Sequence, residues 1–167
     1  MATIHYFKIY QDVSSLKKQY QTLARVFHPD LGGDEEIMKE INNQYFDALK
    51  NKHGTTLKNV DSTDSKVYTY SFDLNVEREL VDKLNEILGK KLVGIDCEII
   101  GTWLWITGDT KAVRIELKAS ALNYHKKREC WYFTAAKKKH YYSAKGFDAL
   151  RMQYGSVSNF KVMDQVK

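Results

Sequence analysis

The sequence has one proline, two cysteines and no apolar run of about 18 residues, the length that a membrane-spanning helix needs. Its N-terminus also lacks the basic and apolar regions of a secretory signal. Cys97 and Cys130 are far apart in the chain, which argues against a disulfide framework or a zinc knuckle and favours a reducing compartment. We therefore expect a cytoplasmic protein without a membrane partner, with both cysteines buried as small apolar side chains.

Motifs of catalysis are missing as well. The chain has no HExxH motif, no glycine-rich phosphate loop, and no Ser-His-Asp or Cys-His arrangement that points to a nucleophile. His125 and His140 lie beside basic residues, which disfavour a metal cation. We therefore predict no enzymatic activity, no cofactor and no metal site.

Positive charge is present, but it is unevenly distributed. The net charge of the chain is +5, of which residues 1–65 contribute −1 and residues 66–167 contribute +6. Within residues 110–145, 10 basic residues stand against 2 acidic ones. This asymmetry indicates two parts with different partners.

Two amphipathic helices are predicted in the N-terminal part. Residues 13–27 place apolar side chains on one face at helical period, and Asp12 precedes them as a suitable N-cap. A second helix follows from Asp34 to Leu49, with negative charge in its first turn. Two such helices with a short connection pack antiparallel, because neither can bury its apolar stripe alone.

The only proline, Pro29, lies between these helices. A proline ends a helix because it has no N–H to donate and displaces the preceding residue from the α region, and Gly32 and Gly33 then allow the chain to turn. Helix termination explains these residues but does not explain His28. The second interpretation is that His28, Pro29 and Asp30 form a binding motif.

The sequence around this motif resembles the J domain of DnaJ-type co-chaperones. The stretches that carry the resemblance are IHYFKIY (4–10) for the family's short first helix, LKKQYQTLARVFHPD (16–30) for its second helix and His-Pro-Asp loop, and MKEINNQYFDAL (38–49) for its third helix. The resemblance implies docking on a DnaK-type heat-shock ATPase and stimulation of its ATP hydrolysis. The contact residues that it implies are His28, Pro29, Asp30, Lys17, Lys18 and Arg25.

These residue types suit contact with a partner rather than bond cleavage. Asp30 can accept charge-assisted hydrogen bonds, Pro29 lowers the entropy lost on docking, and His28 can both donate and accept. The three basic side chains would steer the helix towards an acidic surface. The chain departs from the family at Gln21 and Thr22, where basic residues are usual, and it lacks the Gly/Phe-rich stretch and CxxCxGxG repeats of a full DnaJ protein.

The fold class is predicted to be α+β, with helices packed on a small antiparallel sheet. The predicted division is a J domain at 1–52, a linker at 53–66, an α+β module at 67–156 and a tail at 157–167. Within the module, the pattern predicts a strand at 67–72, a helix at 75–89 capped by Asn75, a hairpin of 92–101 and 102–109, a helix at 110–120 capped by Asp109, a strand at 130–135 and a helix at 146–155.

Residues 101–133 of this module are similar to a segment that accompanies J domains in phages and integrative elements, and more loosely to the HARP module of annealing helicases. Basic and aromatic side chains together favour nucleic acid, since they bind phosphates and stack on bases. The predicted contact residues are Lys126, Lys127, Arg128, Lys137, Lys138, Lys139, Tyr124 and Tyr141. The basic residues flank one strand and make a single stripe only if both loops turn to the same face of the sheet. Otherwise they are two solvated loops.

Two hypotheses follow. In the first, the protein is a co-chaperone adaptor, which engages a DnaK-type ATPase through the His-Pro-Asp loop and links it to a partner bound by the module. In the alternative, it is a phage or mobile-element protein in the bacterial host cytoplasm. Its J-like part would then be a scaffold or decoy, and its function would be to bind nucleic acid or to inhibit a host protein.

Overall fold

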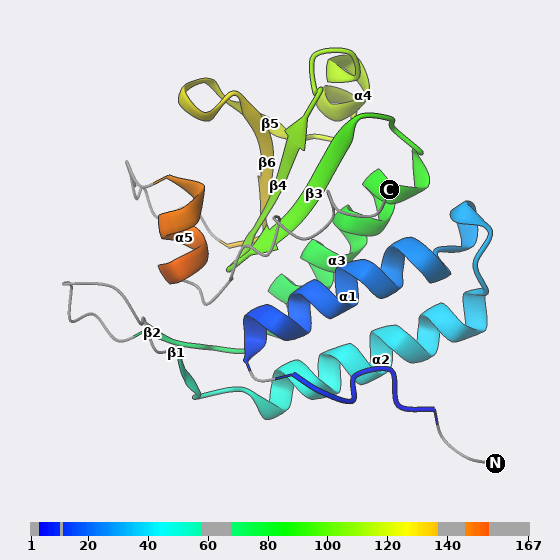
Figure 1. Ribbon diagram of the computed structural model, residues 1–167, viewed down its shortest axis with the longest axis vertical. Helices are drawn as coiled ribbons and strands as arrows, with labels where there is room; N and C mark the ends of the chain where they lie inside the picture. The colour runs from blue at the N-terminus through cyan, green and yellow to red at the C-terminus, as the bar shows by residue number, and fades with distance from the viewer. Residues whose placement is uncertain (1–3, 11, 58–67, 137–145, 154–167) are drawn as a thin grey trace, which may run out of the picture.

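The computed structural model describes residues 4–10, 12–57, 68–136 and 146–153. Helices pack against a four-stranded antiparallel sheet, which confirms the predicted α+β class (Figure 1). The elements are α1 Val13–Phe27, η1 Pro29–Leu31, α2 Glu35–Asn51, β1 Thr56–Leu57, β2 Tyr68–Thr69, α3 Leu74–Gly89, β3 Ile95–Ile100, β4 Trp103–Gly108, α4 Arg114–Ala119, β5 Asn123–His125, η2 Lys126–Arg128, β6 Cys130–Thr134 and α5 Phe147–Gln153. No helix in the described ranges is long and apolar enough to cross a bilayer.

The first predicted helix is confirmed as α1, and its start is set by a capping box. The Asp12 carboxylate accepts a hydrogen bond from the Ser15 N–H at 2.7 Å, and the Ser15 hydroxyl oxygen accepts one from the Asp12 N–H at 3.1 Å. Helix α2 begins in the same way after Asp34, whose side chain accepts from the Ile37 N–H. Local sequence signals therefore determine where both helices start.

The short first helix expected at residues 4–10 from the J-domain resemblance is wrong: this segment is not helical. Its backbone is bound from the side by Gln44 of α2. The Gln44 side chain accepts from the Tyr6 N–H at 2.9 Å and donates to the Ile4 carbonyl at 2.6 Å. The side chain of Gln44 on α2 thus satisfies backbone groups of Ile4 and Tyr6. If residues 4–10 were helical, such groups would bond to one another within the segment.

The predicted hairpin is confirmed as β3 and β4, joined at Gly101, where φ is 61°. The sheet order is β3-β4-β6-β5, so the predicted strand at 130–135 lies beside β4 as β6. Strand β5 was not predicted. It has only three residues and pairs at the sheet edge, Asn123 opposite Tyr132, and so short a segment shows no alternation of apolar and polar residues for sequence reasoning to detect.

Both predicted helix caps in the second part are wrong. Helix α3 is capped by Asp73, whose carboxylate accepts from the N–H groups of Asn75 and Val76, so the helix starts at Leu74. Helix α4 is shorter than residues 110–120 and has no side-chain cap. Its expected cap, Asp109, instead donates its N–H to the Gly94 carbonyl at 2.8 Å, which ties the end of β4 back to the start of β3.

Part of the predicted linker is structured. Thr56–Leu57 forms β1, which pairs with β2 at Tyr68–Thr69, so the predicted strand at 67–72 is shortened to these two residues within the described range. The His53 side chain also accepts a hydrogen bond from the Phe72 N–H at 3.0 Å. The chain on both sides of the undescribed residues 58–67 is therefore held to the rest of the fold.

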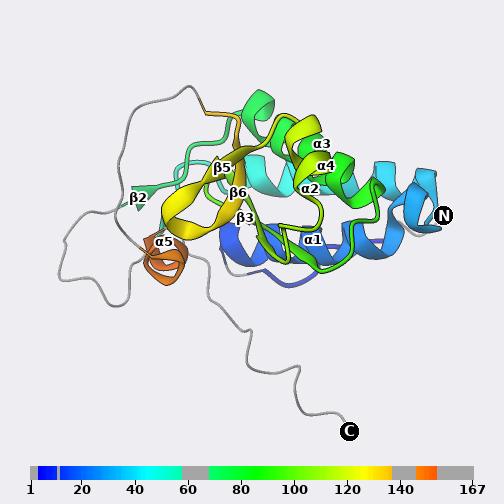
Figure 2. The ribbon, with the colours of Figure 1, turned by 90° about the horizontal axis from the view of Figure 1, so that it is seen from above.

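The predicted J domain and the predicted module share one hydrophobic core. Helix α1 packs against α2 and also contacts β3 (Figures 1 and 2). Its Lys17 and Tyr20 side chains form hydrogen bonds with Glu77 and Asn85 of α3. The buried side chains of this core come from both parts and include Leu16, Tyr20, Ile41, Leu49, Leu80, Leu84, Ile99, Leu104 and Ile106. The apolar stripe of α1 is thus used against the second part as well as against α2.

The opposite face of the sheet carries a second, aromatic cluster under α5. Trp105 is 6% exposed and meets the Phe147 ring edge-on at 5.1 Å, while Arg151 forms an ion pair with Glu98 of β3 at 2.7 Å. Trp131 points to the other face and belongs to the main core. Strand β4 is apolar on both faces because α3 covers one face and α5 the other.

Stability is expected to fall steeply above about pH 9, where cysteine and tyrosine side chains of the unfolded chain begin to ionise. Burial raises the pKa of the Cys97 thiol to about 12. Burial also holds the pKa of the stacked Tyr20 and Tyr45 hydroxyls above the ordinary value. The folded chain keeps these protons, so their stabilisation is present below the unfolded pKa and is lost as pH rises towards the folded pKa.

Between its unfolded-state and folded-state pKa, each such group lowers the free energy of unfolding by about 1.4 kcal/mol for every unit that the pH rises. Thermal melts followed by circular dichroism from neutral to alkaline pH measure the effect. The Cys97→Ala variant removes one of the groups and should show a shallower decline. A melting temperature that stays constant between pH 9 and pH 11 would contradict this account.

Candidate functional site: the His28–Asp30 loop and the basic end of the sheet

The His28–Asp30 loop is a tight, internally bonded connection. Helix α1 ends at Phe27, His28 is extended, and Pro29 opens the short 3₁₀ turn η1. The Asp30 N–H donates to Nδ1 of His28 at 3.1 Å, and Gly32 ends the turn with φ at 91°. The predicted role of the proline and of this glycine in ending the helix and turning the chain is therefore confirmed.

The histidine of this loop is buried against α3. His28 is 6% exposed, and its Nε2 lies 3.0 Å from the main-chain oxygen of Asn85. Because Nδ1 accepts from the Asp30 N–H, Nε2 carries the proton and donates to Asn85. His28 thus joins its own loop to the second part of the chain, while Pro29 and Asp30 stay exposed.

Gly89, the last residue of α3, allows this close approach. A Cβ atom on Gly89 would lie 2.5 Å from Oδ2 of Asp30 and 3.4 Å from Cε1 of His28. The side chains of His28 and Asp30 therefore pack directly against the backbone of α3 at Gly89. In the sequence, Gly89 is simply the last residue of the helix predicted at 75–89. Its contact with the loop was not predicted, because Gly89 is close to His28 and Asp30 only in the folded chain.

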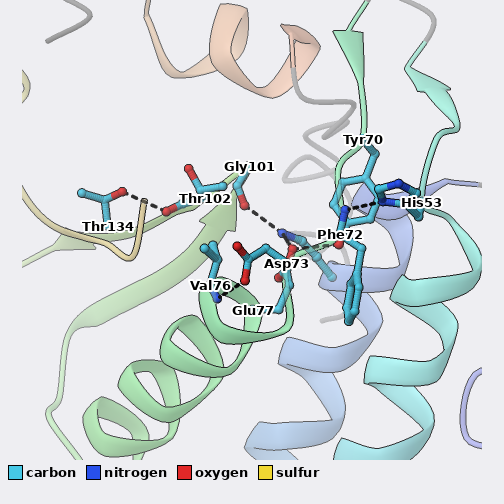
Figure 3. A network of polar contacts seen from close by, with 10 residues as sticks. His53, Tyr70, Phe72, Asp73, Val76, Glu77, Gly101, Thr102 and Thr134 are labelled. Atoms are coloured by element: carbon cyan, nitrogen blue, oxygen red, sulfur yellow. Dashed lines mark hydrogen bonds and ion pairs between the residues drawn. The ribbon is translucent and has the colours of Figure 1, made fainter. Parts of the chain in front are cut away.

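Lys17 is not available for steering, because it forms a buried ion pair. Its Nζ lies 3.0 Å from Oε1 of Glu77 and 2.8 Å from the Gly101 carbonyl oxygen. The same Glu77 oxygen accepts from the Tyr70 hydroxyl at 2.8 Å. Figure 3 shows this network where α3, the β3–β4 turn and Tyr70 meet. Glu77 was not predicted, although a carboxylate between the apolar residues of α3 is itself a signal that a cation faces it.

The two other basic residues of the predicted ATPase contact differ in their surroundings. The Arg25 guanidinium lies 2.7 Å from Oδ1 of Asp96, and both side chains are about half exposed. Lys18 is exposed on α1. Three of the six predicted contact residues, Lys17, Arg25 and His28, therefore bind the second part, and the other three face solvent.

The predicted nucleic-acid residues are only partly described. Lys126 and Lys127 are exposed on η2, whereas the Arg128 guanidinium lies over the rings of Trp105 and Phe147 at 5.1 and 5.2 Å. Lys137, Lys138, Lys139 and Tyr141 lie outside the described residues. The single basic stripe therefore stays a prediction.

A hollow of about 600 Å³ opens beside these residues. Its lining comes from the segment between β4 and α4 and from the β5–β6 hairpin, elements that lie at one end of the sheet (Figure 1). Among the predicted nucleic-acid residues that the structure describes, Tyr124 alone lines it. The described residues that line it are Gly108, Asp109, Thr110, Lys111, Arg114, Tyr124, Glu129 and Trp131. Lys111 and Arg114 were not singled out from the sequence, because they lay in a predicted helix rather than in a basic run.

Comparison with known protein families, curated proteins and solved structures finds no significant match to this chain, so arguments about its function rest on its own residues.

Proposed function

We propose that the protein is a J-type co-chaperone adaptor whose His28–Asp30 loop engages a DnaK-type ATPase and whose second part binds the partner delivered to it. The observation that carries the proposal is the preorganised loop. Its turn is fixed by the His28–Asp30 hydrogen bond and presents Pro29 and the Asp30 carboxylate to solvent at the end of two paired helices. A rigid loop loses little entropy on docking.

The buried His28 implies that the loop is masked in part by α3. Separating all of α1 from α3 would expose fully buried Leu16 and Tyr20, which is costly. Releasing the loop alone breaks one hydrogen bond to Asn85 and the contact with Gly89. We therefore assign docking to the loop together with Lys18, after local release of His28, and we assign Lys17 a structural role.

Stimulation of a bacterial DnaK-type ATPase by the purified chain tests this function. Asp30→Asn is expected to lower stimulation at least about tenfold, because a charge-assisted hydrogen bond to the partner is lost. His28→Gln should act in the same direction, and Lys18→Ala should weaken stimulation mainly at low salt. Glu36→Gln, which removes an exposed carboxylate on the neighbouring helix, is the matched control and should behave as wild type. Stimulation that survives Asp30→Asn contradicts the proposal.

The burial of Lys17 and His28 also favours the second candidate, in which the J-like helices are a scaffold. Here His28 serves only to connect the helix pair to α3, and the exposed basic end of the sheet carries the function by binding nucleic acid or a host protein. The basic residues that the resemblance would place at Gln21 and Thr22 are absent, in agreement with this alternative. This scaffold alternative would be favoured if neither the wild type nor a variant whose loop is released from α3 stimulates ATP hydrolysis.

A further inference from the structure

The hollow at the end of the sheet has two chemically different walls. One wall runs from the end of β4 to the first residue of α4 and contributes two cations, Lys111 and Arg114, beside the carboxylate of Asp109. The other is the β5–β6 hairpin, which contributes Tyr124 and Glu129. The buried Trp131 of β6 also lines the hollow. The two cations thus lie on the wall opposite the Tyr124 ring and the Glu129 carboxylate.

The cationic wall has charge available for a ligand. Lys111 and Arg114 are both exposed, and within the described part of the chain no ion pair or hydrogen bond engages either side chain. The loop that carries Lys111 is held in place, because Asp109 donates to Gly94 and Thr110 is 6% exposed. A cation on this loop and a second at the start of α4 suit a phosphate group.

The opposite wall suits a nucleobase. The Tyr124 side chain is 48% exposed, yet its ring is supported by Trp131 at a centroid distance of 5.4 Å. A supported but exposed ring offers a face on which a base can stack. Glu129, also exposed, follows η2 in a left-handed conformation at φ 50°. A carboxylate repels phosphate but accepts a hydrogen bond from an exocyclic amine such as that of cytosine.

We propose that this hollow binds a nucleotide unit of a single-stranded nucleic acid, with the phosphate at Lys111 and Arg114, the base on Tyr124 and its exocyclic amine at Glu129. A nucleic-acid strand fits the surroundings better than a free nucleotide does. Two further exposed cations, Lys126 and Lys127, follow Tyr124 closely in the chain and could bind the phosphates of neighbouring nucleotides. A duplex does not fit, since its bases are stacked on one another and cannot reach Tyr124. A single-stranded nucleic acid would then be the partner that the second part of the chain binds. This inference depends on the proposed partner-binding role of the second part and not on the proposed ATPase contact.

Fluorescence anisotropy with a labelled single-stranded oligodeoxycytidine tests the site, with the full chain at about 50 mM and about 200 mM salt. Wild type is expected to bind at the lower salt and to weaken at the higher. The Lys111→Glu/Arg114→Glu variant should bind about tenfold or more weakly, and Tyr124→Ala about five- to tenfold more weakly. Glu129→Gln should reduce the preference for oligodeoxycytidine over oligodeoxythymidine, and the same strand placed in a duplex should bind more weakly.

The matched control is Lys50→Glu/Lys90→Glu, which makes the same change in charge at two exposed lysines on α2 and beside α3, outside the hollow. It should retain binding to within about twofold, and circular dichroism should show all variants folded. Three results would overturn the proposal: no binding by wild type at low salt, an equal loss in the control, or equal affinity for 5′-deoxycytidine monophosphate and for the strand. None of these measurements involves the ATPase, so their failure is distinguishable from failure of the co-chaperone function.

Discussion

Replacing Lys17 by methionine is expected to lower the free energy of unfolding by about 3–5 kcal/mol, the cost of leaving one partner of a buried ion pair alone. The pair is well shielded, since the Lys17 and Glu77 side chains are 4% and 3% exposed. The variant leaves the Glu77 carboxylate with only the Tyr70 hydroxyl as a donor. For a chain of this length, the melting temperature should fall by roughly 10 °C. Urea unfolding followed by circular dichroism measures the change.

Two further variants make this result specific. Lys39→Met removes an exposed lysine whose ion pairs to Glu35 and Glu36 are solvated, and it should cost less than about 1 kcal/mol. Adding Glu77→Gln to Lys17→Met removes the buried charge and keeps an acceptor for Tyr70, so it should recover part of the loss. If Lys17→Met costs no more than Lys39→Met, Lys17 is not held as described.

Replacing Gly89 by leucine is expected to release the His28–Asp30 loop from α3 and to raise ATPase stimulation. The new side chain needs the space that Asp30 and the His28 ring occupy. Helix α3 itself is not weakened, because leucine is a better helix former than glycine. If docking of the loop is worth one hydrogen bond, about 0.5–1.5 kcal/mol, the released fraction and hence the stimulation should rise about two- to tenfold.

The release can be measured without the ATPase. The reaction of His28 with diethyl pyrocarbonate, followed by mass spectrometry of the modified peptide, should become faster in Gly89→Leu. Lys90→Leu, a change at the next and exposed position, is the matched control and should leave both measurements unchanged. Faster modification with no ATPase stimulation would reject the masked co-chaperone in favour of the scaffold. Unchanged modification would show that Gly89 does not hold the loop.

Much of the fold follows from short-range patterns. The helical period of residues 13–27, the cap at Asp12 and the stop at Pro29 act within one or two turns of the chain, so they predict α1 correctly. The β3–β4 hairpin was predicted for the same reason, because its strands are joined by a short turn at Gly101. The wrong predictions concern segments whose hydrogen bonds come from elsewhere in the chain. Gln44 binds the backbone of residues 4–10, which were expected to be helical, and the Asp109 N–H donates to Gly94 although Asp109 was expected to cap a helix.

The sequence by itself determined the two amphipathic helices, the His-Pro-Asp loop between them and the α+β class, because these depend on residues close together in the chain. Only the tertiary structure decided which predicted contact residues are free. Lys17 meets Glu77 from 60 positions away, and His28 meets Asn85 from 57. A lysine beside an apolar stripe looks the same in the sequence whether it faces water or a buried carboxylate. Its environment is set by the helix that packs against it, and periodicity within one helix does not encode that partner.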